Sequence, residues 1–254
     1  MKKFRTKKKF GQHLLISEGV ISKIVDTIDV KLEDIIVEIG VGTGQLTQEI
    51  LKRNPKKLYG IEIDETAYPI IEERFKEFEN FELIKKDFFE VNLYEIAENQ
   101  KIKLVGNLPY NVSSLILINT VFYIDIIERT VFMLQKEVAE KLTTKPKTKN
   151  YTFLTIFIQT FFEVEYVMSV PARFFSPPPK VISAVVRMFP KKDYPKIDKK
   201  NYKNFVSSLF SNRRKMLRTK IDENILKSLN IPPTARVEEL KPEDFLRLYE
   251  KIKK

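Results

Sequence analysis

The chain has no cysteine, no tryptophan and one histidine, His13, among its 254 residues. Without cysteine there is no disulfide framework, no thiolate zinc site and no cysteine nucleophile. A single histidine leaves too few ligands for a histidine-rich metal site, and it argues against a Ser-His-Asp triad. The composition therefore favours chemistry that depends on neither a metal nor these nucleophiles, and it suits a cytoplasmic protein.

Long apolar runs are also missing. No stretch approaches the ~18–20 uninterrupted apolar residues that a membrane span requires. The first residues, Met1 to Phe4, lead into further lysines rather than into the apolar segment of a signal peptide. We therefore expect no membrane partner. The length allows one α/β domain with a small appendage.

Acidic residues are too few to balance the basic ones: 45 Lys and Arg stand against 34 Asp and Glu, a formal net charge of +11. Such an excess favours a polyanionic partner. The excess is concentrated in three clusters, each of which could also be an ordinary solvated face. Together they favour contacts with RNA or DNA phosphates. The clusters are Lys2, Lys3, Arg5, Lys7, Lys8 and Lys9; Lys145, Lys147 and Lys149 in an expected flexible loop; and Arg213, Arg214, Lys215, Arg218 and Lys220 on an expected helix.

A glycine-rich turn follows the β-branched segment Ile35–Ile39 and precedes a helix-like segment that starts at Gln45. This is the strand-turn-helix unit of a nucleotide-binding sheet, in which glycines let the backbone approach a ligand. A dinucleotide fingerprint would need a glycine at position 45, which argues against an NAD oxidoreductase. The observed glycines, Gly40, Gly42 and Gly44, have the G-x-G-x-G spacing of S-adenosylmethionine sites.

Two acidic residues stand where the next two expected strands end. Glu62 lies near the end of the segment Leu58–Asp64 and is placed to accept hydrogen bonds from ribose hydroxyls. Asp87 follows Phe81–Lys86, and its carboxylate could hold an adenine amino group. NAD-binding folds also use an acid at the first position, and either residue alone could be a solvated strand end. Their order after the glycine turn favours a nucleoside-containing ligand.

The tetrad Asn107-Leu108-Pro109-Tyr110 follows the apolar run Ile102–Gly106, which reads as a buried strand. It therefore lies at the carboxyl end of a strand, where open α/β sheets bind ligands. It combines an amide, carbonyls beside a rigid proline and an aromatic ring. These groups suit a flat base that carries an exocyclic amino group, although the same four residues also occur as an ordinary turn.

Strands and helices alternate in the expected structure, from an amphipathic helix at Glu18–Ile28 to a fifth strand at Thr130–Leu134. After Pro190 the chain changes to a charged linker and a helical tail. We therefore predict an α/β domain over residues 1–190 and a helical RNA-binding domain over residues 191–254. The other expected elements are helices at Glu137–Leu142 and Tyr151–Phe162, strands at Val164–Val170 and Val181–Phe189, an irregular loop at Pro171–Pro179, and helix breaks at Pro232, Pro233 and Pro242.

In their order along most of the chain, these motifs resemble the rRNA adenine N6-dimethyltransferases, most closely the small-subunit (KsgA-type) dimethyladenosine transferases. Two departures are visible. The family usually has Gln-Asn-Phe-Leu where this chain has Gln12 to Leu15, and Asp at the position of Ile182. The motifs that carry the resemblance are Lys9–Leu15, Glu38–Gly44, Gly106–Asn111, Gln135–Ala139, Phe175–Val181, Ser183–Val186, and Phe210 with Arg213–Lys215.

The resemblance implies a class I S-adenosylmethionine-dependent methyltransferase: a Rossmann-like, mostly parallel seven-stranded sheet with an antiparallel last strand. It implies dimethylation of N6 in two adjacent adenosines of the 3′-terminal hairpin of small-subunit rRNA. Asn107 and the Leu108 carbonyl would accept hydrogen bonds from N6, in a turn made rigid by Pro109. Tyr110 would stack on the base, and Phe175 would cover its other face or the approach.

The remaining site residues follow from the same resemblance. Cofactor contacts would come from the amino-terminal segment, the glycine turn, the two strand-end acids and the tetrad, and RNA contacts from the basic arm, the proline loop and the basic tail. The cofactor residues are His13, Leu15, Gly40, Gly42, Glu62, Asp87 and Asn107. The RNA-binding residues are Lys7, Lys8, Lys9, Lys180, Arg213, Arg214, Lys215 and Arg218.

The sequence leaves three rivals open. A large-subunit adenine methyltransferase of the macrolide-resistance type shares the cofactor motifs and the tetrad, but the proline loop at Phe175–Lys180 favours the small-subunit branch. A DNA adenine methyltransferase usually has a second proline in place of Leu108 and needs a target-recognition region that the short tail hardly provides. The chain could also act mainly by binding, as a ribosome-assembly factor. We expect a monomer that acts on rRNA or on an immature small subunit, without a metal.

Overall fold

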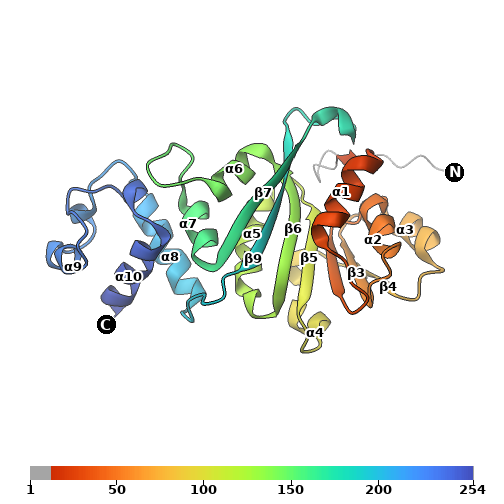
Figure 1. Ribbon diagram of the computed structural model, residues 1–254, viewed down its shortest axis with the longest axis horizontal. Helices are drawn as coiled ribbons and strands as arrows, with labels where there is room; N and C mark the ends of the chain where they lie inside the picture. The colour runs from red at the N-terminus through yellow and green to blue at the C-terminus, as the bar shows by residue number, and fades with distance from the viewer. Residues whose placement is uncertain (1–12, 254) are drawn as a thin grey trace. The chain divides into compact units, whose positions relative to one another are not determined.

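The structure is a computed structural model that describes residues 13–253 (Figure 1). The chain forms two compact units. Unit 1 reaches Ala139 and resumes over Glu165–Pro190, and unit 2 comprises Glu140–Val164 and the chain from Lys191 onward. The expected domain boundary at residue 190 coincides with the last of the three junctions between the units. Residues 140–164, which the sequence analysis assigned to the first domain, cluster instead with the helical tail.

A seven-stranded sheet with the order β4-β3-β2-β5-β6-β9-β7 forms the centre of the fold. The pairs from β4 to β6 are parallel, and β9 pairs antiparallel with β6. This confirms the expected sheet with an antiparallel last strand. The bounds are β2 Ile35–Ile39, β3 Lys57–Glu62, β4 Phe81–Lys85, β5 Ile102–Asn107, β6 Ile127–Gln135, β7 Phe162–Val170 and β9 Ser183–Pro190.

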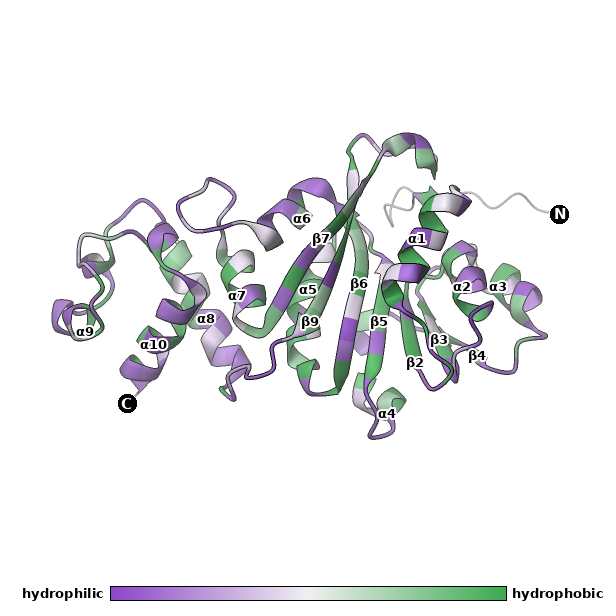
Figure 2. Ribbon diagram, in the orientation of Figure 1, coloured by the Kyte–Doolittle hydropathy of each residue, from purple (hydrophilic) through white to green (hydrophobic). Residues whose placement is uncertain are grey.

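The central strands are almost continuously apolar because helices cover both faces of the sheet. All five residues of β2 are buried, as expected for a parallel strand between two layers of helices. Hydrophobic colour follows the central strands in Figure 2, whereas the loops are mostly hydrophilic. The helices of unit 1 are α1 Glu18–Ile28, α2 Gln45–Leu51, α3 Tyr68–Phe75, α4 Leu93–Ala97 and α5 Ser113–Phe122, with short 3-10 turns η2 Phe88–Glu90 and η3 Ile124–Ile126; α6 Lys136–Thr143 continues β6.

Helix α1 has the bounds that the sequence predicts. Its buried residues, Ile21, Ile24, Val25 and Ile28, recur at helical spacing and belong to the hydrophobic core of unit 1. The helix ends at Asp29 in the left-handed conformation. It packs against α2, the helix that follows the glycine turn.

A two-stranded ribbon ties the amino-terminal segment to the proline loop. Strand β1, Leu14–Leu15, pairs antiparallel with β8, Phe175–Ser176. The Ile16 amide donates to the Phe174 carbonyl at 2.9 Å. The expected irregular loop at Pro171–Pro179 thus contains a short strand, after the 3-10 turn η4 at Ala172–Phe174. The pairing fixes His13 at the carboxyl end of the sheet.

Unit 2 is held together by aromatic side chains. The ring of Tyr202 packs against Phe161 and Tyr249, and its hydroxyl hydrogen-bonds Thr160. The buried Tyr151 hydroxyl donates to the Leu240 carbonyl at 2.8 Å. The helices are α7 Phe153–Phe161, α8 Lys199–Phe210, α9 Glu223–Ser228 and α10 Pro242–Lys253, with η5 Leu217–Thr219 and η6 Val237–Glu239.

One expectation for the tail is confirmed and another is wrong. The helical pattern is interrupted at Pro242, which begins the new helix α10, because the first helical position needs no backbone N–H donor. The segment Arg213–Lys220 is not a helix: α8 ends at Phe210, and a turn and η5 follow. Lys220 donates to the Ser208 and Leu209 carbonyls at the end of α8, at 2.5 and 3.1 Å. Among the described residues, no helix is long and apolar enough to cross a membrane.

Candidate active site

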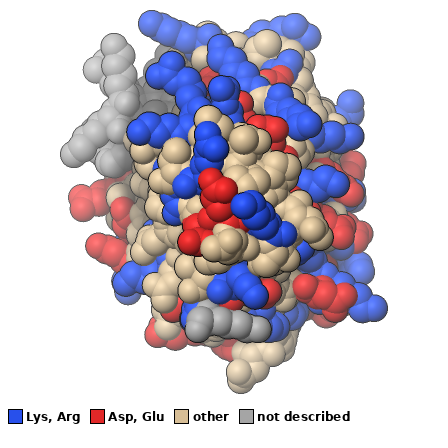
Figure 3. Space-filling model, turned by 90° about the vertical axis from the view of Figure 1, so that its left-hand side faces the viewer, with Lys and Arg blue, Asp and Glu red and all other residues tan. Residues whose placement is uncertain are grey.

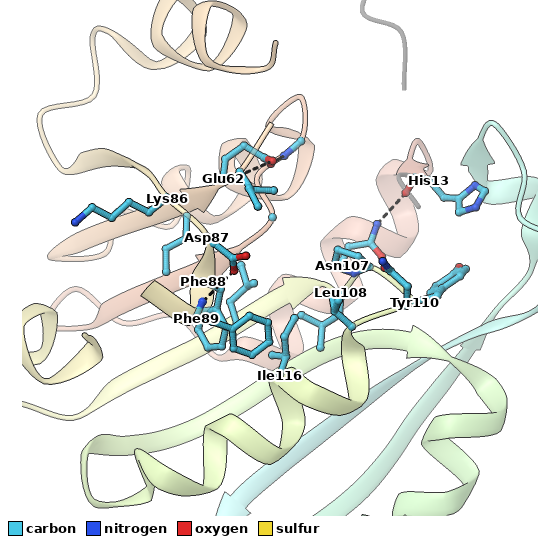
Figure 4. Close-up of a pocket in the computed structure, with 18 of the residues that line it drawn as sticks. His13, Glu62, Lys86, Asp87, Phe88, Phe89, Asn107, Leu108, Tyr110 and Ile116 are labelled. Carbon is cyan, nitrogen blue, oxygen red and sulfur yellow. Dashed lines mark hydrogen bonds between the residues drawn. The ribbon is translucent and has the colours of Figure 1, made fainter. Parts of the chain in front are cut away.

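A cavity lies at the carboxyl ends of β2, β3, β4 and β5 (Figure 4). The expected location at the carboxyl edge of an open α/β sheet is therefore correct. Segments far apart in the sequence form its wall: the amino-terminal segment, the glycine turn, the two strand-end acids and the tetrad. Of the residues assigned from the sequence, those that line it are His13, Gly40, Gly42, Glu62, Asp87, Asn107, Leu108, Pro109 and Tyr110.

The carboxylate of Glu62 stabilises the glycine turn through hydrogen bonds to the backbone. Its Oε2 accepts a hydrogen bond from the Gly42 amide at 2.8 Å, and its Oε1 accepts from the Ile63 and Asp64 amides at 3.0 and 2.8 Å. Gly42 has a φ of 59°, a left-handed conformation that favours glycine. Burial raises the pKa of Glu62, and the three backbone hydrogen bonds oppose that rise. The carboxylate keeps acceptor capacity on the side that faces the cavity.

Asp87 follows β4, the strand next to the one that ends at Glu62, and it caps η2. Its Oδ1 accepts from the Phe89 amide at 3.0 Å, which leaves the second oxygen of the carboxylate for a ligand. Phe88 and Phe89, which follow directly, also line the cavity, and Phe89 is exposed at its rim. The sequence analysis did not single out this aromatic pair. Its position immediately after a strand-end acid could have indicated that it lines the same site.

The tetrad is held by backbone and side-chain hydrogen bonds. Leu108 donates its amide to the Met133 carbonyl of β6 at 2.9 Å, and the Pro109 carbonyl accepts from the first turn of α5. The Tyr110 hydroxyl and the Ser183 hydroxyl hydrogen-bond at 2.6 Å. Burial raises the pKa of Tyr110, and the bond to Ser183 opposes the rise. Tyr110 is therefore a neutral ring with a fixed orientation.

The Asn107 amide has one possible orientation. Its Nδ2 donates to the His13 carbonyl at 2.9 Å. A carbonyl oxygen can only accept, so the amide nitrogen must face it and Oδ1 must point elsewhere. Among the described residues nothing donates to Oδ1, and Asn107 lines the cavity. The side chain thus offers the cavity an acceptor whose direction the amino-terminal segment fixes.

Phe175 does not reach this cavity. It is 3% exposed and packs in the hydrophobic core of unit 1, as does Leu15, its partner in the β1–β8 register. Leu14 lines this cavity, and Leu15 lines a smaller second cavity together with Leu14, Gly40 and Gly42. The expected role of Phe175 in covering the base stays a prediction, and the structure places its ring in the core beside Leu15. Leu15 supports the wall from the core.

Glu38 of β2 is a buried acid that the sequence analysis assigned no role. It is 1% exposed, and its Oε2 accepts from the Thr47 hydroxyl of α2 at 2.6 Å. Burial raises its pKa to about 8, against the lowering effect of the Thr47 hydrogen bond, and the charge of Glu62 adds to the rise. At neutral pH this carboxyl is protonated and can donate a hydrogen bond.

Glu38→Gln is expected to remove a pH dependence of stability. Between pH 4.5 and about 8 the folded protein binds one more proton at this carboxyl than the unfolded chain does. The free energy of unfolding therefore falls as pH rises through this window, by up to about 1.4 kcal/mol per pH unit. Urea unfolding from pH 5 to 8.5 should show a flatter profile for Glu38→Gln than for the exposed control Glu33→Gln. Equal slopes would contradict a protonated Glu38.

The basic residues assigned to RNA differ in their surroundings. Lys7, Lys8 and Lys9 lie outside the described residues, and Lys180, Arg214, Lys215 and Arg218 are exposed. Arg213 is half-buried and fully engaged: it pairs with Glu238 and donates to the Thr148 and Lys149 carbonyls at 2.8 Å each. It joins the 145–149 loop to η6 within unit 2. Lys and Arg side chains are abundant on the face that Figure 3 shows.

Arg213→Ala is expected to lower stability, whereas Arg214→Ala is expected to lower the affinity for rRNA. Loss of Arg213 leaves Glu238 and two carbonyls without their donor, which should cost about 2 kcal/mol of stability. Arg214 is exposed, so its loss should change stability by less than about 0.5 kcal/mol. If Arg214 contacts a phosphate, its loss should reduce the slope of log affinity against log salt for rRNA by about 1. Equal destabilisation of the two variants would contradict the assignment.

The sequence model of the ribosomal RNA adenine dimethylase family matches residues 3–254. The chain belongs to this family. Two relatives named ribosomal RNA small subunit methyltransferase A come from Persephonella marina and Sulfurihydrogenibium sp.. The first is 67% identical over 98% of this chain and 94% of its own length, and the second is 62% identical over 98% and 97%. The family predicted from the motifs is confirmed.

Solved structures agree with this dimethylase fold. A dimethyladenosine transferase from Plasmodium falciparum superposes with a TM-score of 0.84 at 26% identity, over 95% of this chain and 98% of that one. The 23S rRNA methyltransferase ErmE gives 0.71 at 26% identity, over 95% and 100%. The expected class I methyltransferase fold is therefore confirmed. The methyl donor of this dimethylase is S-adenosylmethionine, as expected.

The cavity fits the chemistry of that donor. Glu62 retains acceptor capacity towards the cavity, as ribose hydroxyls require, and Asp87 has an oxygen left for an amino group. The Gly40 and Gly42 turn has no side chain to keep a ligand from the backbone. Among residues 13–253, no group of three or more His, Asp and Glu could hold a metal ion.

Proposed function

We propose that the chain transfers methyl groups to N6 of two adjacent adenosines in the 3′-terminal hairpin of small-subunit rRNA. The observation that carries the proposal is the Asn107 amide, fixed with its oxygen towards the cavity beside the ring of Tyr110. High identity to relatives named for the small subunit favours this rRNA over that of the large subunit.

The acceptor oxygens explain how a poor nucleophile reacts. The lone pair of adenine N6 is delocalised into the ring. Asn107 Oδ1 and the Leu108 carbonyl accept its two N–H bonds, which turns the lone pair towards the methyl group. S-adenosylmethionine supplies that methyl group in an electrophilic form, on a sulfonium. Tyr110 stacks on the base and holds it in line, and such positioning supplies most of the rate. The transfer leaves a positive charge on the methylated N6, and this ammonium is acidic enough to lose its proton to water, so no strong base is needed.

The cofactor contacts assigned from the sequence are part of this proposal. Gly40 and Gly42 admit the donor to the backbone, Glu62 accepts from its ribose and Asp87 from its adenine. The backbone of His13 reaches the same wall through Asn107. Tyr110, which lines this cavity as well, offers its ring to the second ligand, the target base.

RNA contacts are proposed for exposed cations that no described partner neutralises. In unit 2 they include the 145–149 loop, held in place by Arg213, and Arg214, Lys215 and Arg218. Such contacts position a substrate without reading its sequence. We further propose that the chain acts as a monomer, in the cytoplasm, on an immature small subunit in which the target adenosines can leave their stack.

Methyl transfer from radiolabelled S-adenosylmethionine to three substrates tests the proposal. Undermethylated small subunits, large subunits and plasmid DNA are incubated separately with the enzyme. Label on small subunits alone is the expected result. Label on large subunits would instead indicate a large-subunit adenine methyltransferase of the macrolide-resistance type. Label on DNA would contradict the assignment of RNA as the substrate. Tight binding to small subunits without label would indicate an assembly factor.

A further inference from the structure

The glycine turn between β2 and α2 has few side chains of its own to hold its shape. Gly40, Gly42 and Gly44 all have positive φ, of 78°, 59° and 85°. Because glycine has more backbone conformations open to it than any other residue, a turn with three of them needs support from its surroundings. The Gly44 amide donates to the Val41 carbonyl at 3.0 Å and so closes the turn. The peptide group between Thr43 and Gly44 therefore sets the closed conformation.

That peptide group is held by Arg74 of α3, from outside the cavity. The Arg74 Nη1 donates to the Thr43 carbonyl at 2.5 Å, across 31 residues of the chain. The Nη2 of the same side chain donates to the side-chain oxygen of Gln48 in α2, the helix that lies beside α3 in Figure 1. Neither Thr43 nor Arg74 lines the cavity. One guanidinium thus joins the turn to the helix that follows it.

This use of a helix-terminal arginine is unusual. Arg74 lies in the last turn of α3, where a basic side chain commonly interacts with the carbonyls of its own helix. Here both acceptors belong to other elements, and among residues 13–253 no carboxylate pairs with the guanidinium. Phe75, the next residue, packs against the same turn, since a Cβ built on Gly44 would lie 2.5 Å from its ring. Consecutive residues of α3 therefore support the turn, Phe75 by packing and Arg74 by hydrogen bonds.

We propose that Arg74 is a positioning residue for the methyl donor, because it holds the glycine turn in its binding conformation without touching the ligand. The inference rests on the proposed function, which places the donor at this turn. Glu62 holds the turn from the cavity side, through the Gly42 amide at 2.8 Å. A turn that is fixed from both sides before binding loses less conformational freedom when the ligand arrives, so the ligand binds more tightly.

Arg74→Ala separates this role from a role in stability. Arg74 is exposed, so its loss should leave the midpoint of urea unfolding within about 0.3 M of that of the unchanged protein. The Kd for S-adenosylmethionine, measured without RNA, should rise about five- to tenfold. In methylation of small subunits, KM for the donor should rise by the same factor. Neither kcat nor KM for the small subunit should change by more than about twofold.

Two further variants show whether the bond to Thr43 is the cause. Arg74→Lys keeps a charged donor for the Thr43 carbonyl but cannot reach Gln48 with the same geometry, so its Kd should stay within about threefold of that of the unchanged protein. Lys76→Ala breaks only the exposed pair with Glu73 and should leave Kd unchanged. Hydrogen exchange gives a readout without ligand: the Gly44 amide should exchange several times faster in Arg74→Ala, and at the normal rate in Lys76→Ala.

Three results would overturn the proposal: a Kd for Arg74→Ala within about twofold of the normal value, the same rise in Lys76→Ala, or a matching rise in KM for the small subunit. Glu62→Gln tells this failure from that of the proposed site. If Glu62→Gln and Arg74→Ala both leave Kd unchanged, the donor does not bind at this turn. If Glu62→Gln raises Kd about tenfold or more and Arg74→Ala does not, only the role of Arg74 is wrong.

Discussion

Replacement of Asn107 by alanine is expected to lower methyl transfer at least about a thousandfold while S-adenosylmethionine binding weakens by less than about tenfold. The side-chain oxygen is the acceptor that turns the N6 lone pair towards the methyl group. Its direction is set by the bond from Nδ2 to the His13 carbonyl. Single-turnover transfer to small subunits and equilibrium cofactor binding measure the two effects separately.

Asn107→Asp sharpens this test because it keeps the size of the side chain. The carboxylate still accepts hydrogen bonds, but it has no N–H for the His13 carbonyl, so two oxygens would face each other there. Transfer should therefore fall almost as far as in the alanine variant. Asn204→Ala, at an exposed position of α8, is the control and should be unaffected. Parallel losses of cofactor binding and transfer would make Asn107 mainly a cofactor ligand.

Asp34→Ala is expected to cost about 3–5 kcal/mol of stability, the largest effect we predict away from the cavity. Lys103 of β5 is 1% exposed, and its ammonium donates to Asp34 at 2.5 Å and to the Asp29 carbonyl at 2.6 Å. Removal of Asp34 leaves a buried cation with too little compensation. Asp34 precedes β2, at the end of the sheet opposite the cavity. Urea unfolding should therefore show the loss, while kcat of the folded fraction stays unchanged.

Two further variants show whether burial is the cause. Glu73→Ala breaks the exposed pair with Lys76 and should cost less than about 1 kcal/mol. The double variant Asp34→Leu with Lys103→Met removes both buried charges and should recover most of the loss. A double variant as unstable as Asp34→Ala would mean that the lost packing, and not the unpaired charge, is responsible.

Much of the site could be predicted because its constraints are local in sequence. The glycine spacing at 40, 42 and 44 records a backbone conformation, and all three glycines have positive φ. Glu62 and Asp87 end neighbouring parallel strands, so the sheet brings them to one edge. Asn107 ends β5 for the same reason. Local patterns of this kind determine where the backbone of a residue lies. The positions of the glycine turn and of the strand-end residues could therefore be predicted correctly from the sequence.

Side-chain surroundings depend on contacts that no local pattern records. Phe175 belongs to a proline-rich loop, which the sequence alone suggests is exposed. Its pairing with Leu15 places the ring in the hydrophobic core instead. The His13 ring hydrogen-bonds the carbonyl of Pro177, which lies 164 residues further along the chain. This bond orients the ring that stacks on Tyr110. Sequence alone could place His13 near the site but could not predict where its ring lies.

The basic tail shows the same dependence on distant contacts. Charge alone groups Arg213 with its neighbours as an RNA contact, which stays a prediction, and no local pattern indicates its ion pair with Glu238. Lys220 likewise closes the carboxyl end of α8. The expected boundary at residue 190 agrees with a junction between the units, but residues 140–164 were placed in the other domain. Their helix α7 is apolar enough to suit the core of either domain, and the tertiary packing assigns it to unit 2.

Dimethylation of adjacent adenosines in small-subunit rRNA is the activity that we assign to this site. The most direct measurement is complete methylation of undermethylated small subunits, followed by digestion of the rRNA and quantification of its methylated nucleosides per particle. We expect N6,N6-dimethyladenosine at two adjacent positions of the 3′-terminal hairpin. N6-monomethyladenosine as the end product, or modification of a single position, would contradict it.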